Sequence, residues 1–273
     1  MDSSTTDFAI HVLRPPAAPE CLRKYASIFR DLRLQALRES PESFTEGYED
    51  VASRPAAFWQ DFIKHHVGLI HIAFGISPMS VPPTSNKAKV ASQSDFIMDV
   101  GLPLSMAVNS GPVTQERFLS LPNSRVPLNR PDSEEMRFHG GMLFHIARMR
   151  GTQRGHLFEN LTLDRDEWLL EQLLSADNDP PPVARFRGNV KTGPQQRKLL
   201  AFYVSAGWYI AGTQTWRSNL LAEGGEAAVQ AAECRGDDME EVSIVVEKIF
   251  TVPQLEWQIR KNKRILAQPG ARL

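Results

Sequence analysis

Apolar residues near the start of the chain recur at the spacing of amphipathic helices. From residue 20 to residue 38 they fall at every third or fourth position, at Leu22, Ala26, Phe29, Leu32 and Ala36. A second helix is predicted after Ser53, a residue suited to an N-cap, and its apolar face is formed by Phe58, Trp59, Phe62 and Ile63. Each of these helices is therefore expected to bury one face.

Strand patterns follow in the middle and last parts of the chain. Branched and aromatic residues are concentrated in the ranges 69–74, 96–108 and 141–149, and a further strand is predicted at 209–215. Residues 183–190 alternate strictly, with one face formed by Ala184, Phe186 and Val190 and the other by Arg185, Arg187 and Asn189.

Two helices are interleaved with these strands. One is predicted to begin near Leu157, and the other begins at Pro194 and meets a C-terminal glycine at Gly207. The alternation of Val242, Ile244 and Val246 indicates a last strand. Strands and helices in this order predict an α/β or α+β fold, in which helices pack on a sheet.

Two stretches rich in serine and proline interrupt these elements, at 77–94 and 120–135. Both exceed the roughly 12–15 residues of an ordinary unstructured connection. We interpret them as loop insertions in a single domain that spans residues 8–250. Residues 251–273 contain a basic run and are predicted to form a polar, solvated C-terminal tail.

The composition narrows the class of protein. Hydrophobic residues make up 42% of the chain and charged residues 23%, which excludes disorder of the whole chain. The net charge of -1 excludes a strongly electropositive protein, the usual property of a nucleic-acid binder. No run approaches the roughly 18–20 apolar residues that cross a membrane, and the polar N-terminus does not resemble a secretory signal. We expect a cytoplasmic protein, with a nuclear location left open, and no nucleic-acid or membrane partner.

The segment 148–160 combines a strand end, a short loop with Gly151 and Gly155, and the start of a helix. Such a junction directs unpaired backbone N–H groups and the positive end of the helix dipole at one point, where a phosphate fits. Arg150 and Arg154 would add positive charge. The alternative is an ordinary turn with two exposed arginines. Neither this segment nor Cys21 and Cys234 indicates a metal site.

Two side chains are candidates for proton transfer. Tyr203 lies one turn before the end of its predicted helix and could act as a general acid, although a core role is the alternative. His145, on the strand 141–149, is a candidate base, as are His139 and Glu135 just before it. A histidine on an apolar strand is more often a hydrogen-bonded core residue, so the base is left open.

Taken together, three segments resemble a known family. The first is 32–59, in which the matching residues are Arg33, Leu34, Ala36, Leu37, Ser40, Pro41, Phe44 and Trp59. The second is the strand with a Gly-Pro pair in 101–112, and the third is 190–212, with Val190, Phe202, Tyr203, Gly207 and Trp208. On these residues the chain resembles the GNAT-type N-acetyltransferases, as a divergent member similar to fungal small-molecule acetyltransferases.

The resemblance implies a central mixed, mostly antiparallel sheet that is splayed at the middle, with helices on both faces. It also implies acetyl-CoA as co-substrate, direct attack by an amine of a small-molecule acceptor, Tyr203 and His145 as catalytic residues, and a monomer or homodimer. The residues implied to bind the cofactor are Ala147, Arg148, Met149, Arg154, Gly155, His156, Leu157 and Gln196.

One departure from the family pattern supports an alternative function. Leu157 and Glu159 stand where the family's pyrophosphate loop has glycines. The alternative is a GNAT-like fold that has lost catalysis and serves as a binding or regulatory module.

Overall fold

The computed structural model describes residues 7–13, 19–44, 46–76, 102–118, 130–146, 154–176, 182–191, 196–235 and 238–266. The expected loop insertion 77–94 lies outside these residues, as does the part of the expected insertion 120–135 that precedes residue 130. The N-terminal part of the expected strand 96–108 and the last residues of the expected strand 141–149 also lie outside them.

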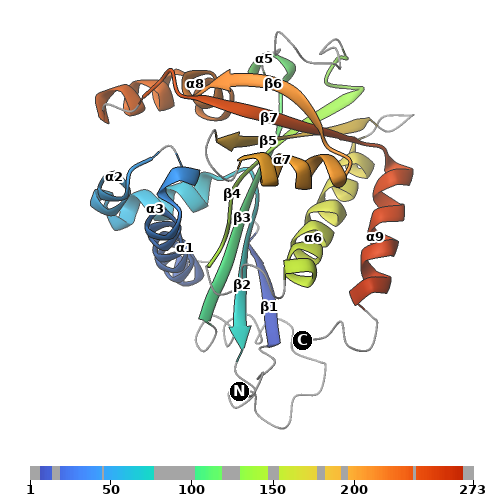
Figure 1. The fold of residues 1–273 in the computed structure, drawn as a ribbon, viewed down its shortest axis with the longest axis horizontal. Helices are drawn as coiled ribbons and strands as arrows, with labels where there is room; N and C mark the ends of the chain where they lie inside the picture. Colours follow the sequence, from blue (N-terminus) through green and yellow to red (C-terminus); the bar gives the residue numbers. More distant parts are fainter. Residues whose placement is uncertain are drawn as a thin grey trace.

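The described strands form one seven-stranded sheet in the order β1-β2-β3-β4-β5-β7-β6 (Figure 1). The strands are β1 (Asp7–Leu13), β2 (Gly68–Ile76), β3 (Leu102–Val113), β4 (Glu135–His145), β5 (Val183–Lys191), β6 (Tyr209–Thr215) and β7 (Val242–Phe250). Neighbouring strands are antiparallel except β4 and β5, which pair in parallel. The prediction of a mixed, mostly antiparallel sheet is confirmed.

Helices cover both faces of this sheet (Figure 1). They are α1 (Pro19–Glu39), the 3₁₀ helix η1 (Pro41–Ser43), α2 (Tyr48–Ser53), α3 (Ala56–His65), α5 (Gln115–Phe118), α6 (Arg154–Ser175), α7 (Gln196–Ser205), α8 (Trp216–Arg235) and α9 (Val252–Leu266). Helices α1 and α3 lie on one side of β1–β4, and α6 and α9 lie on the other. No described helix is both long and apolar enough to cross a membrane.

The first core lies between α1, α3 and the face of β2, β3 and β4 that they cover. The expected apolar stripe of α1 supplies Ala26, Phe29, Leu32 and Ala36, all at most 3% exposed. The Phe29 ring packs against Trp59 and Phe62 of α3 at centroid distances of 6.0 and 5.5 Å. The periodicity therefore predicted the buried face of α1 correctly, and on α3 it did so for Trp59 and Ile63, whereas Phe58 is 39% exposed.

The second core lies on the opposite face, between the sheet and α6. Trp168 and Leu169 of α6 pack against Phe138 of β4 and Phe186 of β5, and Leu255 of α9 joins the same cluster. Trp168 meets the Phe138 ring edge-on at 5.1 Å. This second core therefore covers one face of the sheet where β4 and β5 lie side by side.

The structure corrects one sequence-based expectation and adds two elements. Residues 251–273 were expected to form a solvated tail, but 252–266 form α9, which packs on α6 through the buried residues Leu255 and Ile259. Lys263 of the basic run pairs with Glu167 of α6 at 2.7 Å. Charged residues dominate this stretch, so its sequence pattern shows only a narrow apolar stripe and does not indicate a packed helix. Strand β1 and helix α8 were not predicted either.

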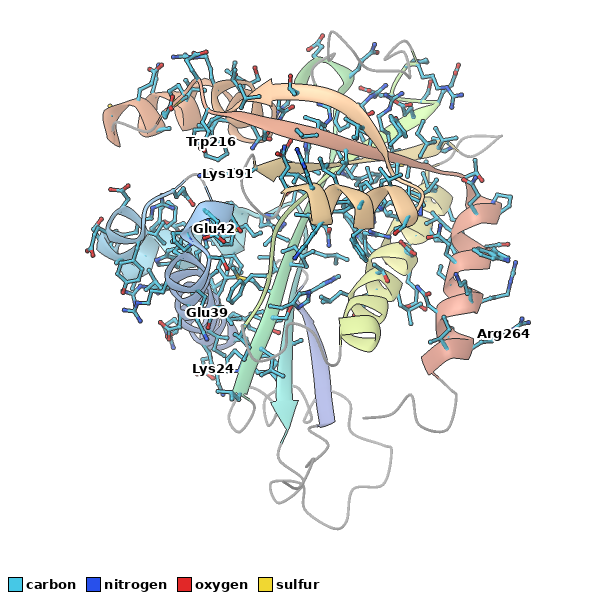
Figure 2. The ribbon with its side chains drawn as sticks, in the orientation of Figure 1. Lys24, Glu39, Glu42, Lys191, Trp216 and Arg264 are labelled. Carbon is cyan, nitrogen blue, oxygen red and sulfur yellow. The ribbon has the colours of Figure 1, made fainter. Side chains whose placement is uncertain are left out.

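The end of β5 contacts the segment that follows α1. Lys191 Nζ donates a hydrogen bond to the Phe44 carbonyl oxygen at 2.6 Å and pairs with Glu241 at 2.9 Å. Figure 2 shows Glu42 and Lys191 near each other, with Lys24 at the opposite end of α1. This contact ties the N-terminal helices to the C-terminal half of the sheet.

Candidate functional site

The two parallel strands at the centre of the sheet separate partway along their length. Their pairing runs from Glu135 opposite Val183 to Gly140 opposite Gly188. Beyond these glycines β4 continues beside β3 alone, and β5 continues beside β7 alone. We call the space between the two diverging strands the β4–β5 opening. The sheet is therefore splayed at its middle, as the resemblance implied.

A bulge in β4 accompanies this separation. Met106 pairs with Phe144 and Val108 with Gly141, so β4 carries one extra residue across this interval. Met142 has a φ of 51°, in the left-handed region that non-glycine residues seldom adopt. An unpaired extra residue bends its strand and locally ends regular pairing. The bulge therefore turns β4 at the point where β5 departs.

The bulge also reverses which residues of β4 face which core. Phe138 belongs to the core beneath α6, whereas Phe144, an even number of residues later, belongs to the core beneath α1. His145 consequently lies on the α6 face of the sheet, and it is half-buried at the end of β4. Without the extra residue, His145 would face the other way.

Glycine is required on β4 next to the opening. A Cβ added to Gly140 would lie 2.4 Å from the Phe186 ring, closer than any carbon contact allows. A Cβ added to the next residue, Gly141, would meet no described atom within 4 Å. The wall of the opening is thus tightly packed at Gly140 and open at Gly141.

Helix α6 begins with Arg154, three residues before the expected start near Leu157. Its first turn consists of Arg154, Gly155, His156 and Leu157, whose backbone N–H groups have no partner within the helix. The expected cofactor-binding residues Ala147, Arg148 and Met149 lie outside the described part of the chain. The helix dipole places partial positive charge at this first turn, which suits an anion.

Helix α7 ends in a glycine-dependent cap that holds Tyr203. Gly207 has a φ of 81°, and Trp208 N donates to the Tyr203 carbonyl oxygen at 3.0 Å across it. This is the 6→1 hydrogen bond of a Schellman motif. Gln196 is the first residue of α7 and is half-buried. The glycine predicted to end this helix therefore does so, and it orients the turn that carries Tyr203.

The side chain of Tyr203 is half-buried against the core beneath α6. Its ring meets Trp208 edge-on at 5.2 Å, and its hydroxyl forms no hydrogen bond to a described residue. Burial raises the pKa of this phenol, and the nearby Arg165 guanidinium partly offsets the rise. Leu199 and Phe202 of the same helix are 39% and 42% exposed.

His139 and Glu135, the two other candidate bases, lie on the face of β4 opposite to His145 and Tyr203. Glu135 is 1% exposed and pairs with Arg137 Nε at 3.1 Å and with Arg185 Nη2 at 2.9 Å. His139 is 3% exposed, and burial lowers its pKa to about 3. Because Glu135 is buried, paired with two arginines and on the face opposite to Tyr203, we exclude it as the base.

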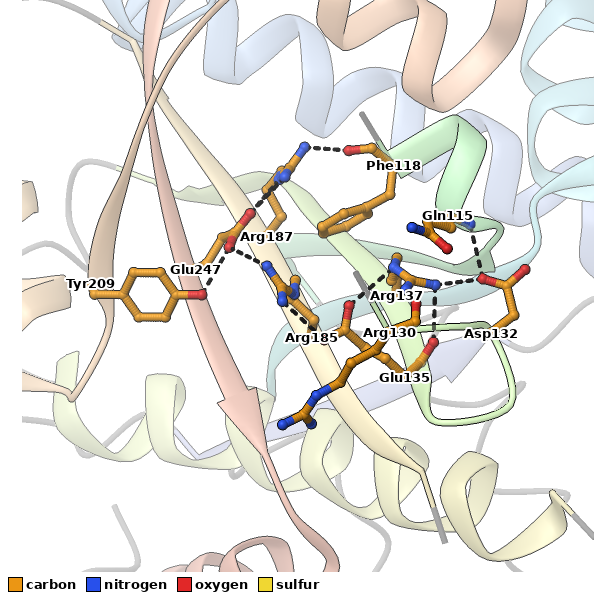
Figure 3. A network of polar contacts seen from close by, with 10 residues as sticks. All are labelled: Gln115, Phe118, Arg130, Asp132, Glu135, Arg137, Arg185, Arg187, Tyr209 and Glu247. Atoms are coloured by element: carbon orange, nitrogen blue, oxygen red, sulfur yellow. Dashed lines mark hydrogen bonds and ion pairs between the residues drawn. The ribbon is translucent and has the colours of Figure 1, made fainter. Parts of the chain in front are cut away.

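These two residues belong to a buried charge network on β4, β5 and β7 (Figure 3). Glu247 of β7 accepts hydrogen bonds from Arg187 Nε at 2.9 Å, from Arg185 Nη1 at 3.3 Å and from the Tyr209 hydroxyl at 2.8 Å. Glu135, Arg137, Arg185, Arg187 and Glu247 are all at most 1% exposed. We refer to these five side chains as the arginine–glutamate network.

The register of the sheet brings this network together. His139, Arg187, Glu247 and Tyr209 are direct cross-strand neighbours on β4, β5, β7 and β6. Phe118 of α5 covers the row, with the Arg187 guanidinium 3.9 Å above its ring. The alternation of residues 183–190 predicts the strand and its apolar face, but it does not indicate that the arginine face is buried as well. The signal for it is a glutamate in register with Arg187 and a second glutamate, Glu135, one register step from Arg185 on that face, and both require the sheet order.

Among the described residues, no group of three or more histidine, cysteine, aspartate or glutamate side chains could hold a metal ion. The structure places Tyr203 and His145 on the same face of the sheet.

No known protein-family profile and no curated protein sequence matches the chain. Similar solved structures include a GNAT-family acetyltransferase from Streptococcus pneumoniae, with 11% identity, a TM-score of 0.46, and 90% of this chain and 100% of that chain covered. A spermidine N-acetyltransferase from Vibrio cholerae, in complex with CoA and spermine, has 6% identity and a TM-score of 0.43, with 92% and 98% covered. Arabidopsis thaliana NAA60, in complex with acetyl-CoA, has 11% identity and a TM-score of 0.43, with 89% and 98% covered.

Proposed function

We propose that this protein is an acetyl-CoA-dependent N-acetyltransferase that acts on an amine of a small-molecule acceptor. The observation that carries the proposal is the β4–β5 opening. There β4 runs on past Gly140 without β5 beside it, on the same sheet that carries α6 and Tyr203. A strand edge without a partner offers backbone N–H and C=O groups to a ligand.

The residues around the opening fit acetyl-CoA. The pantetheine arm carries amide groups, which the free edge of β4 and the following Ala147, Arg148 and Met149 would bind. The first-turn amides of Arg154, Gly155, His156 and Leu157 would hold the pyrophosphate, because four unpaired N–H groups and a helix dipole converge there. Gln196, at the start of α7, would border the same ligand. Acetyl-CoA supplies the acyl group as an activated thioester.

Tyr203 is proposed as the general acid. Its raised pKa keeps the phenol protonated at neutral pH, so the hydroxyl has a proton to donate. The acceptor nitrogen forms a bond to the thioester carbon, and the carbon–sulfur bond breaks. Tyr203 then gives its proton to the departing sulfur, and a free thiol is released.

His145 is proposed as the base that takes the proton lost by the attacking amine, directly or through one water molecule. The bulge turns its side chain to the face of the sheet that carries Tyr203, where it is half-buried. Histidine is the side chain that most often serves as a general base in enzymes. We further propose a cytoplasmic protein that is monomeric or homodimeric.

The first experiment measures acetyl-CoA binding by thermal shift on the full chain. Because a ligand that binds only the folded state raises its stability, we expect the melting temperature to rise with acetyl-CoA concentration. No rise at millimolar acetyl-CoA would contradict the enzyme function and favour the non-catalytic binding module.

The second experiment measures thiol release against a panel of amines. Tyr203→Phe is expected to lower kcat by about 10²–10⁴-fold, with little change in acetyl-CoA binding. Tyr209→Phe is the matched control, since the Tyr209 hydroxyl binds Glu247 on the opposite face, and it should leave kcat unchanged. Equal kcat values for the Tyr203→Phe variant and the unmodified protein would remove Tyr203 from the mechanism.

A further inference from the structure

A concave surface lies between the first half of α1 and the start of α3, with a volume of about 320 Å³. We call it the α1–α3 pocket, and it is lined by Arg23, Ala26, Ser27, Arg30, Arg54, Ala56, Trp59 and Gln60. Lys24, the neighbour of Arg23, lies at the end of α1 away from Glu42 and Lys191 (Figure 2). The pocket is therefore separate from the β4–β5 opening.

The lining of this pocket is positively charged. Three arginines, Arg23, Arg30 and Arg54, contribute to it, and no acidic side chain does. Its floor includes the ring of Trp59, which is 3% exposed, and the methyl groups of two alanines. A cavity that combines an apolar floor with several convergent donors has the composition of a small-molecule site.

The nearby carboxylates do not balance these arginines. Glu46 is shared by Arg33, at 2.8 Å, and Arg54. Arg30 lies 3.6 Å from Asp31, a side chain that is 66% exposed and therefore well solvated. Arg23 forms no ion pair with any described residue. Four arginines thus face two carboxylates, an excess of two positive charges in a chain whose net charge is -1.

The pocket also contains donors without acceptors. The indole Nε1 of Trp59 is buried and has no hydrogen-bond partner in the described part of the chain. The side chains of Ser27 and Gln60 form no hydrogen bond to other described residues. A buried N–H group without a partner costs about 1–3 kcal/mol, and an acceptor seated beside it removes that cost.

We propose that the α1–α3 pocket binds a small anion that carries carboxylate or phosphate oxygens. Arg30 and Arg54 hold these oxygens with their planar guanidinium groups, which match both anions in a bidentate manner. Arg23, at the mouth, adds charge, and the apolar floor contacts the carbon skeleton of the ligand. The volume suits a metabolite rather than a polymer.

The experiment titrates inorganic phosphate and citrate separately into the full chain, without acetyl-CoA and at constant ionic strength. Isothermal titration calorimetry and thermal shift should show saturable binding of at least one of them. Saturation by citrate alone identifies a carboxylate ligand, and saturation by phosphate identifies a phosphate ligand. Acetyl-CoA, which is proposed to bind elsewhere, should not displace the anion.

Variants locate the binding. Arg30→Gln should weaken the anion at least tenfold, and Arg23→Gln, at an exposed position, should weaken it severalfold without changing the melting temperature of the free protein. Arg260→Gln on α9 is the matched control, since it removes the same charge from a side chain that is 63% exposed. The proposal is overturned by the absence of saturable binding at millimolar anion, by displacement by acetyl-CoA, or by equal weakening in Arg260→Gln.

Discussion

The two faces of β5 are both buried, but one is stabilised by apolar packing and the other by ion pairs. On one face, Ala184, Phe186 and Val190 pack against α6 and Trp208 without polar partners. On the other, Arg185 and Arg187 are fully buried and held by Glu135 and Glu247. An alternating strand usually has one solvated face, whereas here the polar face is covered by α5.

The difference determines how each face tolerates change. Apolar packing depends on volume, so it loses stability gradually as side chains shrink or grow. A buried ion network depends on each partner, because removal of one charge leaves another buried and uncompensated. The charged face should therefore respond to single substitutions more strongly than the apolar face does.

The largest effect is expected for Glu247→Ala. It leaves Arg185 and Arg187 buried without a shared carboxylate, which should lower the free energy of unfolding by about 3–5 kcal/mol. Urea denaturation measures this loss. Glu241→Ala removes a partly exposed partner of Lys191 and should cost about 0–1 kcal/mol. Similar losses in the two variants would show that the network is no more sensitive than a surface pair.

A smaller loss is expected on the apolar face for Gly140→Ala. The new methyl group would overlap the Phe186 ring and should cost about 1–3 kcal/mol. Phe186→Leu in the same chain should recover part of this loss, which a double-mutant cycle in urea detects. Gly141→Ala places its methyl group in open space and should be tolerated. Additive effects at Gly140 and Phe186 would rule out the contact as the cause.

The pH dependence of stability tests the charged face in another way. Burial, together with Arg187 and Arg117, lowers the pKa of His139 from 6.5 to about 3. Below pH 6.5 His139 is protonated in the unfolded chain but stays neutral in the folded protein. The free energy of unfolding therefore decreases as the pH decreases, by about 2 kcal/mol at pH 5. His139→Leu should remove this part of the fall between pH 7 and pH 5.

The control for this pH effect is His65→Gln, at an exposed position on the end of α3, which should keep the full pH dependence. Parallel pH profiles for His139→Leu and the unmodified protein would mean that His139 is protonated in the folded state.

The smallest effect is expected for Tyr209→Phe. Burial and the Glu247 carboxylate raise the pKa of Tyr209, so its protonated hydroxyl donates to Glu247. Loss of this donor should cost about 1 kcal/mol, because both arginines remain on the carboxylate. Tyr48→Phe provides the comparison in thermal or urea unfolding, because the Tyr48 hydroxyl accepts a hydrogen bond from the exposed side chain of Arg38. A loss as large as that of Glu247→Ala would contradict this ranking.

The fold was predictable where periodicity is strong. The stripe of α1 predicts the correct element and buried face, the stripe of α3 predicts the correct element although Phe58 is exposed, and the alternation of β5 predicts the strand and its apolar face. Helix α9 was missed because buried Leu255 and Ile259 are separated by charged residues, so its apolar stripe is narrow. The start of β4 was placed at Gly141 instead of Glu135, because Glu135, Arg137 and His139 read as solvated residues.

The site was predictable only in its parts. The glycine cap at Gly207 and the position of Tyr203 on α7 follow from local sequence. The side of the sheet on which His145 lies depends on one extra residue in β4 opposite β3. This register is set by the pairing of two strands, so it cannot be predicted from the sequence of β4 alone. The alternative bases at Glu135 and His139 looked equivalent to His145 for the same reason.

The order of strands has a consequence for how the chain folds. Strands β1 to β4 are neighbours in chain order, and β5, β6 and β7 form a second antiparallel group within residues 183–250. Among the described strands, the parallel pairing of β4 with β5 is the pairing that links the two groups, and it spans the long crossover through α6. Local pairings form before distant ones because loop closure costs entropy. The β4–β5 opening is therefore expected to form after each group has paired its own strands, so the site proposed there depends on the docking of both halves.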